Sequence, residues 1–433
     1  RQQRNPRALP IRKVFWRYRV RVSRCHVAHS LVASISFPNA ERVLSRRLHL
    51  QFHQSSCIVR SVLAQVQNLP TSAEYHHPTM SILERVNVLE NFGLPSGMAE
   101  AVEKEDRQVG MRIFIVDNST STKKKDALYF PKMKPEDVKV EPQPCTRWEE
   151  IKRMAIEQAE LNAQTKVPCR FFVLNPSQAA QESNWQNLKA GTDYCEINTL
   201  NGTMQEQVHV LKNMLDTTKL RAGTPLGKCI EAVGRLLQAD LDTMIEEQKL
   251  AYLVLVTDGV PSDESDSSFM HTESLMVKGL RKLCAEYPLF VVIRLCTSNQ
   301  RVANYFNKLD QEVEFALDVL CNLEAEARQV KAVNPWLTYF PELHAIREGG
   351  TNLRLLDLLD ERPFTGDEIR KFMQMFMFRT SDPPIPDWRN AAQFTQALAN
   401  LNEKMSKFYD PTDRTMKLMI DVSEVHKVLT AYL

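Results

Sequence analysis

The 433-residue sequence lacks several patterns that would place it in a common class of protein. No apolar run reaches the roughly 18 to 20 residues that a membrane-spanning helix needs, and the start has no continuous apolar core typical of a secretory signal. We therefore predict no transmembrane segment. The nine cysteines include no CxxC pair. This spacing excludes zinc-ribbon and RING sites, argues against a disulfide framework, and predicts a reducing, cytoplasmic setting.

Familiar catalytic motifs are also missing. The sequence has no HExxH helix and no GxSxG elbow. The segment 222–229 resembles a phosphate-binding P-loop, but Ala222 replaces its first glycine and Cys229 replaces its magnesium-binding hydroxyl. We therefore predict that the protein is not an enzyme, with a metal-dependent hydrolase as an alternative.

Charge is distributed unevenly along the chain. Residues 1–79 contain thirteen lysines and arginines but only two acidic residues, Glu41 and Glu74. We predict that this stretch is a disordered extension, and an organellar transit segment of similar composition is the alternative. The remainder has more acidic than basic residues, which gives it no general attraction for nucleic acid. No nucleic-acid partner is predicted.

Apolar runs bounded by turn residues alternate with helical patterns in the middle of the chain. The runs at 113–116, 171–174, 253–256 and 289–295 predict buried strands, joined by a last strand at 314–320 and a short edge strand at 194–198. Capping residues and periodicity predict helices at 146–163, 204–215, 225–249, 275–286 and 302–309. This alternation indicates an α/β fold with a doubly wound, mostly parallel sheet flanked by helices.

The pattern changes on both sides of this region. A helical lead is predicted at 80–107, the α/β domain at 108–325, and a helical C-terminal extension at 326–433. Within the extension, Thr365 and Glu368 form a capping-box pattern, and a proline-rich linker precedes a final helical segment at 390–433.

Oxygen-bearing side chains stand at three places that such a fold brings together. The first strand ends in a DxSxS pattern that contains Asp117, Ser119 and Ser121; Thr224 opens a helix; and Asp258 follows the strand at 253–256. In a doubly wound sheet the carboxyl ends of the parallel strands share one edge, where ligands bind. Carboxylate and hydroxyl oxygens suit Mg²⁺ or Mn²⁺. Because only two of the groups are carboxylates, the metal keeps a positive field and an open position that a partner's acidic group can fill.

Each of these residues also has a purely structural alternative. Thr224, which precedes Pro225, could cap a helix, and Asp258 could belong to a turn. Ser119 and Ser121 could likewise cap or turn the chain. The metal site is therefore predicted from the combination and not from any single residue.

The five residues together resemble the metal-ion-dependent adhesion site (MIDAS) of von Willebrand factor A (vWA) and integrin I-type domains, in that family's order. The resemblance covers roughly residues 108–325. It implies that Ser119 and Ser121 ligate the metal directly, that Asp117 and Asp258 act directly or through water, and that Thr224 ligates in a conformation-dependent manner.

The resemblance also implies a function. Members inside cells commonly serve in multiprotein assemblies, so we expect an adaptor or scaffold that binds an Asp or Glu carboxylate of a protein partner. A copine-like protein with peripheral membrane association is the alternative, although no paired C2 domains precede the vWA region. The long stretch from Thr122 to Cys145, which contains three consecutive lysines, departs from the family pattern.

Overall fold

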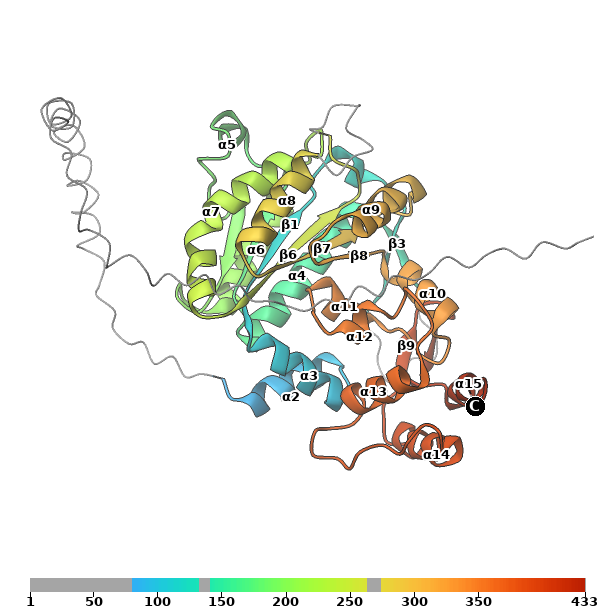
Figure 1. Ribbon diagram of the computed structural model, residues 1–433. Coiled ribbons are helices and arrows are strands. Elements are labelled where there is room, and N and C mark those ends of the chain that lie inside the picture. Colours follow the sequence, from blue (N-terminus) through green and yellow to red (C-terminus); the bar gives the residue numbers. More distant parts are fainter. Residues whose placement is uncertain (1–79, 132–140, 263–273, 433) are drawn as a thin grey trace, which may run out of the picture. The chain divides into compact units, whose positions relative to one another are not determined.

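A six-stranded sheet forms the centre of the computed structural model, which describes residues 80–131, 141–262 and 274–432 (Figure 1). The extension predicted at 1–79 lies outside the described residues. The strand order is β5-β4-β1-β6-β7-β8, and every neighbouring pair is parallel except β4 and β5. The strands are β1 (Val109–Val116), β4 (Cys169–Val173), β5 (Tyr194–Ile197), β6 (Leu250–Thr257), β7 (Leu289–Leu295) and β8 (Leu317–Leu320).

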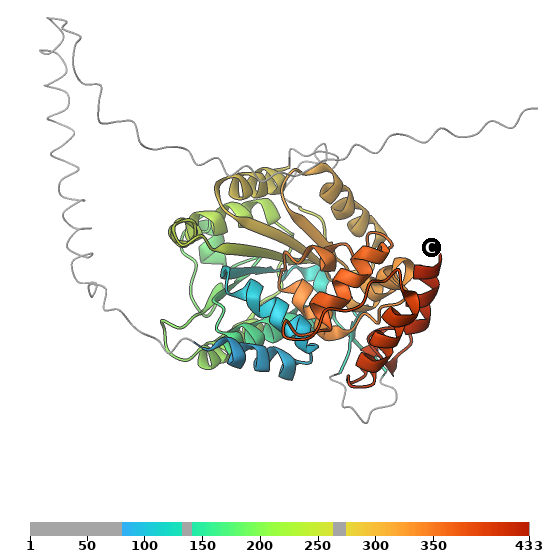
Figure 2. The ribbon, with the colours of Figure 1, turned by 60° about the horizontal axis from the view of Figure 1, so that its bottom comes forward.

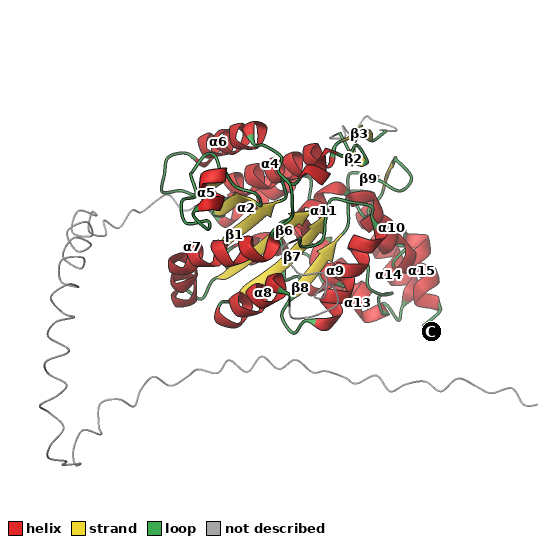
Figure 3. Ribbon diagram, turned by 90° about the horizontal axis from the view of Figure 1, so that it is seen from above, coloured by secondary structure: helices red, strands yellow, loops and turns green. Residues whose placement is uncertain are grey.

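Helices cover both faces of the sheet, as the α/β prediction requires. Figure 3 shows the sheet between two helical layers. One layer contains α4 (Arg147–Thr165) and α6 (Met204–Thr217), and the other contains α7 (Leu226–Glu246), α8 (Leu275–Glu286) and α9 (Gln300–Glu312). The apolar residues of each strand alternate between these layers, so that Phe114 packs toward α4 whereas Ile113 and Ile115 pack toward α7. The predicted α/β architecture is confirmed.

The stretch between the first strand and α4 contains short elements. The 3₁₀ helix η1 (Thr120–Lys123) follows β1, and β2 (Ala127–Tyr129) pairs antiparallel with β3 (Gln143–Cys145). The helix α5 (Gln178–Glu182) follows β4. Thr146 then begins α4 with the predicted capping box: its hydroxyl accepts from the amide of Glu149, whose side chain accepts from the amide of Thr146.

The helical lead and the C-terminal extension share one hydrophobic core. The lead consists of α2 (Ile82–Phe92) and α3 (Ser96–Asp106), and α3 packs beside α13 (Gly366–Phe376) (Figures 1 and 2). Leu89 and Met98 from the lead are buried together with Trp336, Phe340 and Phe372 from the extension. The remaining helices of the extension are α10 (Leu323–Val333), α11 (Pro341–Glu348), α12 (Arg354–Asp357), α14 (Ala391–Asn402) and α15 (Val422–Thr430).

The final segment, predicted as helical at 390–433, also contains strands. Between α14 and α15 lies an antiparallel pair, β9 (Phe408–Asp410) and β10 (Thr415–Lys417). Asp410 forms the turn between the two strands: its side chain accepts from the amide of Thr412 at 2.8 Å, and its carbonyl accepts from the amide of Arg414 at 2.7 Å. A short aspartate-based turn of this kind favours a hairpin over a helix.

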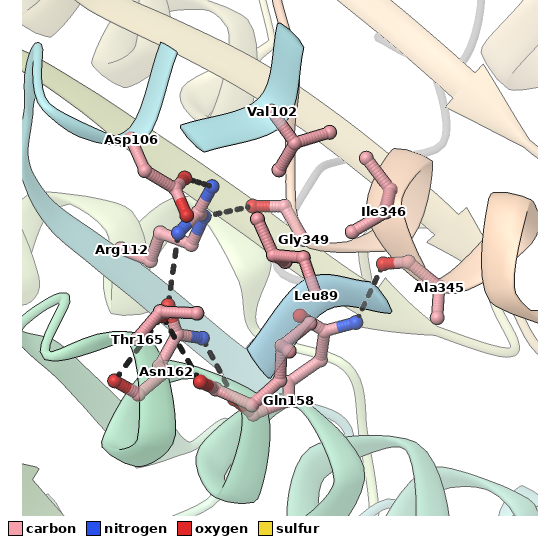
Figure 4. Close-up of a pocket in the computed structure, with 11 residues that line it drawn as sticks. Leu89, Val102, Asp106, Arg112, Gln158, Asn162, Thr165, Ala345, Ile346 and Gly349 are labelled. Atoms are coloured by element: carbon pink, nitrogen blue, oxygen red, sulfur yellow. Dashed lines mark hydrogen bonds and ion pairs between the residues drawn. The ribbon is translucent and has the colours of Figure 1, made fainter. Parts of the chain in front are cut away.

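The extension also covers part of the sheet through the end of α11. Arg112 on β1 donates to Asp106 at 2.7 Å, to Asn162 at 2.9 Å and to the carbonyl of Gly349 at 3.0 Å (Figure 4). The cavity at this junction is about 10 Å³, which holds one water molecule at most. This junction is therefore a packing contact and not a ligand site.

Two further contacts fix α11 against the same face of the sheet. Arg294 on β7 donates to Glu150 of α4 at 2.5 Å and to Glu348 of α11 at 2.6 Å, and all three side chains are largely buried. Gly350 has a φ of +88°, and a Cβ atom there would lie 2.5 Å from the ring of Tyr252 on β6. Only glycine allows this close approach of the chain to the sheet.

Candidate metal site

Four of the five predicted site residues meet at the carboxyl edge of β1 and β6. The hydroxyl oxygens of Ser119 and Ser121 are 2.8 Å apart. The Oδ1 atom of Asp258 lies 2.7 Å from the Ser121 hydroxyl and 3.4 Å from the Ser119 hydroxyl. Asp117, Ser119 and Asp258 are buried, whereas Ser121 is half-buried, so the cluster reaches the surface through Ser121.

Asp117 lies on the buried side of this cluster. Its Oδ1 accepts from the amide of Ser119 at 2.8 Å, and its Oδ2 accepts from the hydroxyl of Thr257 at 2.7 Å. Burial, followed by the charge of Asp258, raises the pKa of Asp117 to about 6. Both carboxylate oxygens of Asp117 therefore accept from protein donors.

Thr224 lies beside the cluster without a hydrogen bond from its hydroxyl to the other four residues. Its Oγ1 would be 3.5 Å from a Cβ atom built on Gly259, the residue after Asp258. The purely capping role considered for Thr224 is not seen, since the residue before α7 is Pro225 and no side chain caps that helix. Instead, Ser262 holds the Thr224 segment: its hydroxyl accepts from the Thr224 amide at 2.6 Å.

The alternative role of the two serines is seen in part, because their carbonyls accept from the amides of Thr122 at 3.2 Å and Lys124 at 3.1 Å in the turn that forms η1. Ser119 precedes η1, but its side chain makes no capping hydrogen bond there. Its hydroxyl and that of Ser121 are used across the cluster, toward each other and toward Asp258.

The donor set fits a hard divalent cation. In octahedral Mg²⁺ coordination at roughly 2.0 to 2.1 Å, neighbouring ligand oxygens are about 2.9 Å apart. Two of the separations among the oxygens of Ser119, Ser121 and Asp258, at 2.7 and 2.8 Å, are close to this spacing, and the third is longer at 3.4 Å. Within the described residues no group of three or more His, Cys, Asp or Glu side chains could hold a metal ion, so a site here depends on hydroxyl ligands.

A guanidinium group beside the cluster was not predicted from the sequence. Arg147, the first residue of α4, donates to the Oδ2 atom of Asp258 at 2.9 Å. It also donates to both carboxylate oxygens of Asp126, at 2.5 and 2.6 Å. Its side chain is only 5% exposed. Asp258 therefore turns one oxygen toward the serines and the other toward Arg147. Hydrogen bonding to Arg147 lowers the pKa of Asp126.

One weak signal in the sequence points to Arg147. A cation in the first turn of a helix is unfavourable, because the unpaired amide groups there carry partial positive charge. An arginine at that position requires a nearby anion, and Asp126 and Asp258 supply two. Because Arg147 and Asp258 are 111 residues apart, no local sequence pattern predicts that they pair.

Metal affinity is expected to fall at acidic pH. A ligand set must be deprotonated to bind a cation, and the raised pKa of Asp117 means that this carboxyl takes up its proton as the pH falls through about 6. Mg²⁺ titrations by calorimetry should show binding about tenfold weaker at pH 5 than at pH 7.5. Asp117→Asn should bind more weakly at both values and lose most of this pH dependence. Equal wild-type affinity at the two pH values would contradict the role of Asp117.

Removal of Arg147 is expected to change metal and carboxylate binding in opposite directions. Arg147→Gln takes a cation away from Asp258, so Mg²⁺ should bind roughly tenfold more tightly, while the loaded site should hold an acidic ligand less tightly. Calorimetry with Mg²⁺ measures the first effect directly. Arg153→Gln is the matched control, since Arg153 lies on the same helix and stacks on Tyr129. Unchanged or weaker Mg²⁺ binding in Arg147→Gln would refute this role.

Comparisons with known proteins add little. No family model matches the chain, and no curated protein matches it. Among solved structures, the chain is similar to proximal thread matrix protein 1 from the mussel byssus, with 12% sequence identity and a TM-score of 0.31. That match covers 49% of this chain and 43% of the other, so it spans less than half of the byssus protein. A similarity this low carries no argument about function.

Proposed function

We propose that this protein is a metal-dependent protein-binding module of the vWA type, which holds Mg²⁺ or Mn²⁺ and captures an Asp or Glu carboxylate of a partner. The observation that carries the proposal is the triangle of oxygens from Ser119, Ser121 and Asp258 at the edge of a doubly wound sheet. Asp117 lies behind this triangle and Thr224 beside it, which supports the proposal.

A bound cation would cancel the local negative charge. Asp117, Asp126 and Asp258 bring three negative charges, and Arg147, which pairs with both Asp126 and Asp258, offsets one of them. A divalent cation on the serine hydroxyls would supply Lewis acidity and bring the net charge of this group to zero. The side chain of Asp126 is 43% exposed, so water screens its charge more than the charges of the buried groups, and the buried part of the site still favours a carboxylate.

The same contacts argue for binding and against catalysis. Ser119 and Thr257 occupy the oxygens of Asp117, and Ser121 and Arg147 occupy those of Asp258. Carboxylates engaged in this way hold their neighbours in place and are poorly disposed to transfer protons, as a general base would have to do. We therefore propose a scaffold or adaptor and not an enzyme.

We also propose a cytoplasmic location. Seven cysteines fall within the described residues, and none of the seven forms a disulfide bond there. Free, mostly buried cysteines are typical of a reducing compartment. Separately, none of the helices in the described ranges is long and apolar enough to cross a membrane.

A direct test is calorimetric titration of Mg²⁺ and Mn²⁺ into the full chain, followed by titration of an acetylated, amidated Gly-Asp-Gly-Gly peptide with and without a chelator. Saturable metal binding and chelator-sensitive peptide binding are expected. An absence of saturable binding for either metal at millimolar concentration would overturn the proposed function.

A further inference from the structure

A polar recess lies next to the candidate metal site. Its volume is about 180 Å³, far above the roughly 10 to 15 Å³ that one water molecule needs. Its lining includes Asn118 and Asn175, which follow β1 and β4, and the chain from the end of α6 at Thr217 to Arg221. The recess is large enough to admit an acidic side chain.

The recess and the metal cluster share a wall. Asn118 stands between Asp117 and Ser119 in the sequence, and its carbonyl accepts from the amide of Arg221 at 2.9 Å. The carbonyl of Arg221 in turn accepts from the amide of Thr120 at 2.7 Å. A ligand on the serine hydroxyls would therefore have the recess directly beside it.

The side chains of two asparagines hold this wall in place. Asn118 donates to the carbonyls of Asn175 at 2.9 Å and Lys219 at 3.1 Å, and it accepts from the amide of Asn175 at 2.7 Å. Asn175 then donates to the carbonyl of Gly223 at 2.9 Å. These bonds join the loops after β1 and β4 to the segment before α7, so the recess is formed before any ligand arrives.

The recess carries cationic side chains that the fold does not use. Lys219 is exposed and Arg221 half-buried, and neither side chain makes a hydrogen bond or ion pair within residues 80–131, 141–262 and 274–432. The one carboxylate in the lining, Asp193, is occupied by the amides of Ser177 at 2.6 Å and Lys189 at 2.9 Å. Asp193 therefore belongs to the wall, and the two cations are left for a ligand.

We infer that this recess is a second subsite, which takes a second acidic side chain of the same partner that the metal site captures. This inference rests on the proposed function. Arginine presents a planar fork that matches a carboxylate, and Arg221 stands nearest to the metal cluster. The partner is thus a diacidic segment, with one carboxylate on the metal and the other on Arg221 and Lys219.

The test compares acetylated, amidated Gly-Asp-Gly-Gly with versions in which Glu replaces one glycine, each titrated by calorimetry into the Mg²⁺-loaded full chain. The best diacidic peptide should bind about tenfold more tightly than the monoacidic one. Arg221→Gln should reduce this ratio to about one without weakening the monoacidic peptide. Lys371→Gln, an exposed lysine on α13 far along the chain, is the matched charge control and should keep the ratio.

The two proposals fail in different ways. One outcome would contradict the subsite and leave the metal site standing. In it the monoacidic peptide binds with metal, but the diacidic peptide binds no more tightly than the monoacidic one, or still binds more tightly in Arg221→Gln.

A second experiment follows the chemical shifts of the Lys219 and Arg221 amides while the diacidic peptide is added in the presence of chelator. Shifts there without any metal-dependent gain would support the subsite and contradict the proposed function. If inorganic phosphate shifts the Lys219 and Arg221 amides but peptides show no preference for two acids, the recess binds free anions and the inference is overturned.

Discussion

Asp258→Asn is expected to abolish saturable Mg²⁺ binding by the full chain, with a loss of at least about a hundredfold in affinity. Asp258 is the one carboxylate whose oxygen lies among the serine hydroxyls, at 2.7 and 3.4 Å from them. The substitution keeps the size of the side chain but removes the charge that faces the ion. Binding of the monoacidic peptide should be lost together with binding of the metal.

Asp242→Asn serves as the control for this variant, because Asp242 is an exposed aspartate on α7. It should leave Mg²⁺ affinity unchanged. Thermal unfolding of both variants separates loss of the site from loss of the fold. Asp258→Asn should stay folded, because Arg147 keeps Asp126 as a partner. If Asp258→Asn binds Mg²⁺ as tightly as the wild type, the metal site proposed here does not exist.

Arg294→Met is expected to destabilise the protein by about 3 to 5 kcal/mol, the cost typical of removing one partner from a buried ion pair. Arg294 is 4% exposed and joins Glu150 of α4 to Glu348 of α11. Methionine fills part of the space but leaves Glu150 without this donor and Glu348 with His344 alone. The midpoint of urea unfolding at neutral pH measures the effect.

Arg235→Met is the matched control. Arg235 pairs with Glu231 one turn away on the surface of α7, where such pairs contribute little. Burial alone would raise the pKa of Glu348, but His344 and Arg294 hold it at about 2. A depressed pKa stabilises the fold above the unfolded value of 4.5, and this contribution is lost as the pH falls through about 2. The difference in unfolding free energy between wild type and Arg294→Met should therefore become smaller in acid. A difference below about 1 kcal/mol at neutral pH would contradict the role of Arg294.

Local patterns predicted much of the fold because the signals act over a few residues. The box formed by Thr146 and Glu149 begins α4, the box formed by Thr365 and Glu368 begins α13, and the apolar period at 275–286 gives the bounds of α8. The first strand was predicted only at 113–116 because Arg112 interrupts its apolar run. The strand begins at Val109, since partners far along the chain satisfy that arginine.

The candidate site divides in the same way. Asp117, Ser119, Ser121 and Asp258 were identifiable because they follow two buried strands, and strands of a parallel sheet end at a common edge. Arg147 and Arg221 were not identifiable, because their contacts join segments that lie far apart in the chain. Nothing in the sequence near Lys219 indicates a recess, which forms only when three loops meet.

The contact of Gly350 with Tyr252 bears on how this protein can be divided and recombined. A segment can be moved into another protein only if its own residues cover its apolar faces. A segment of residues 108–325 would leave the face of β6 and β7 without α11. Arg112 and Arg294 would then lose Gly349 and Glu348. The segment that can be transferred as a folded unit is therefore longer than the sheet and its flanking helices. A transplanted binding site must include residues 341–350.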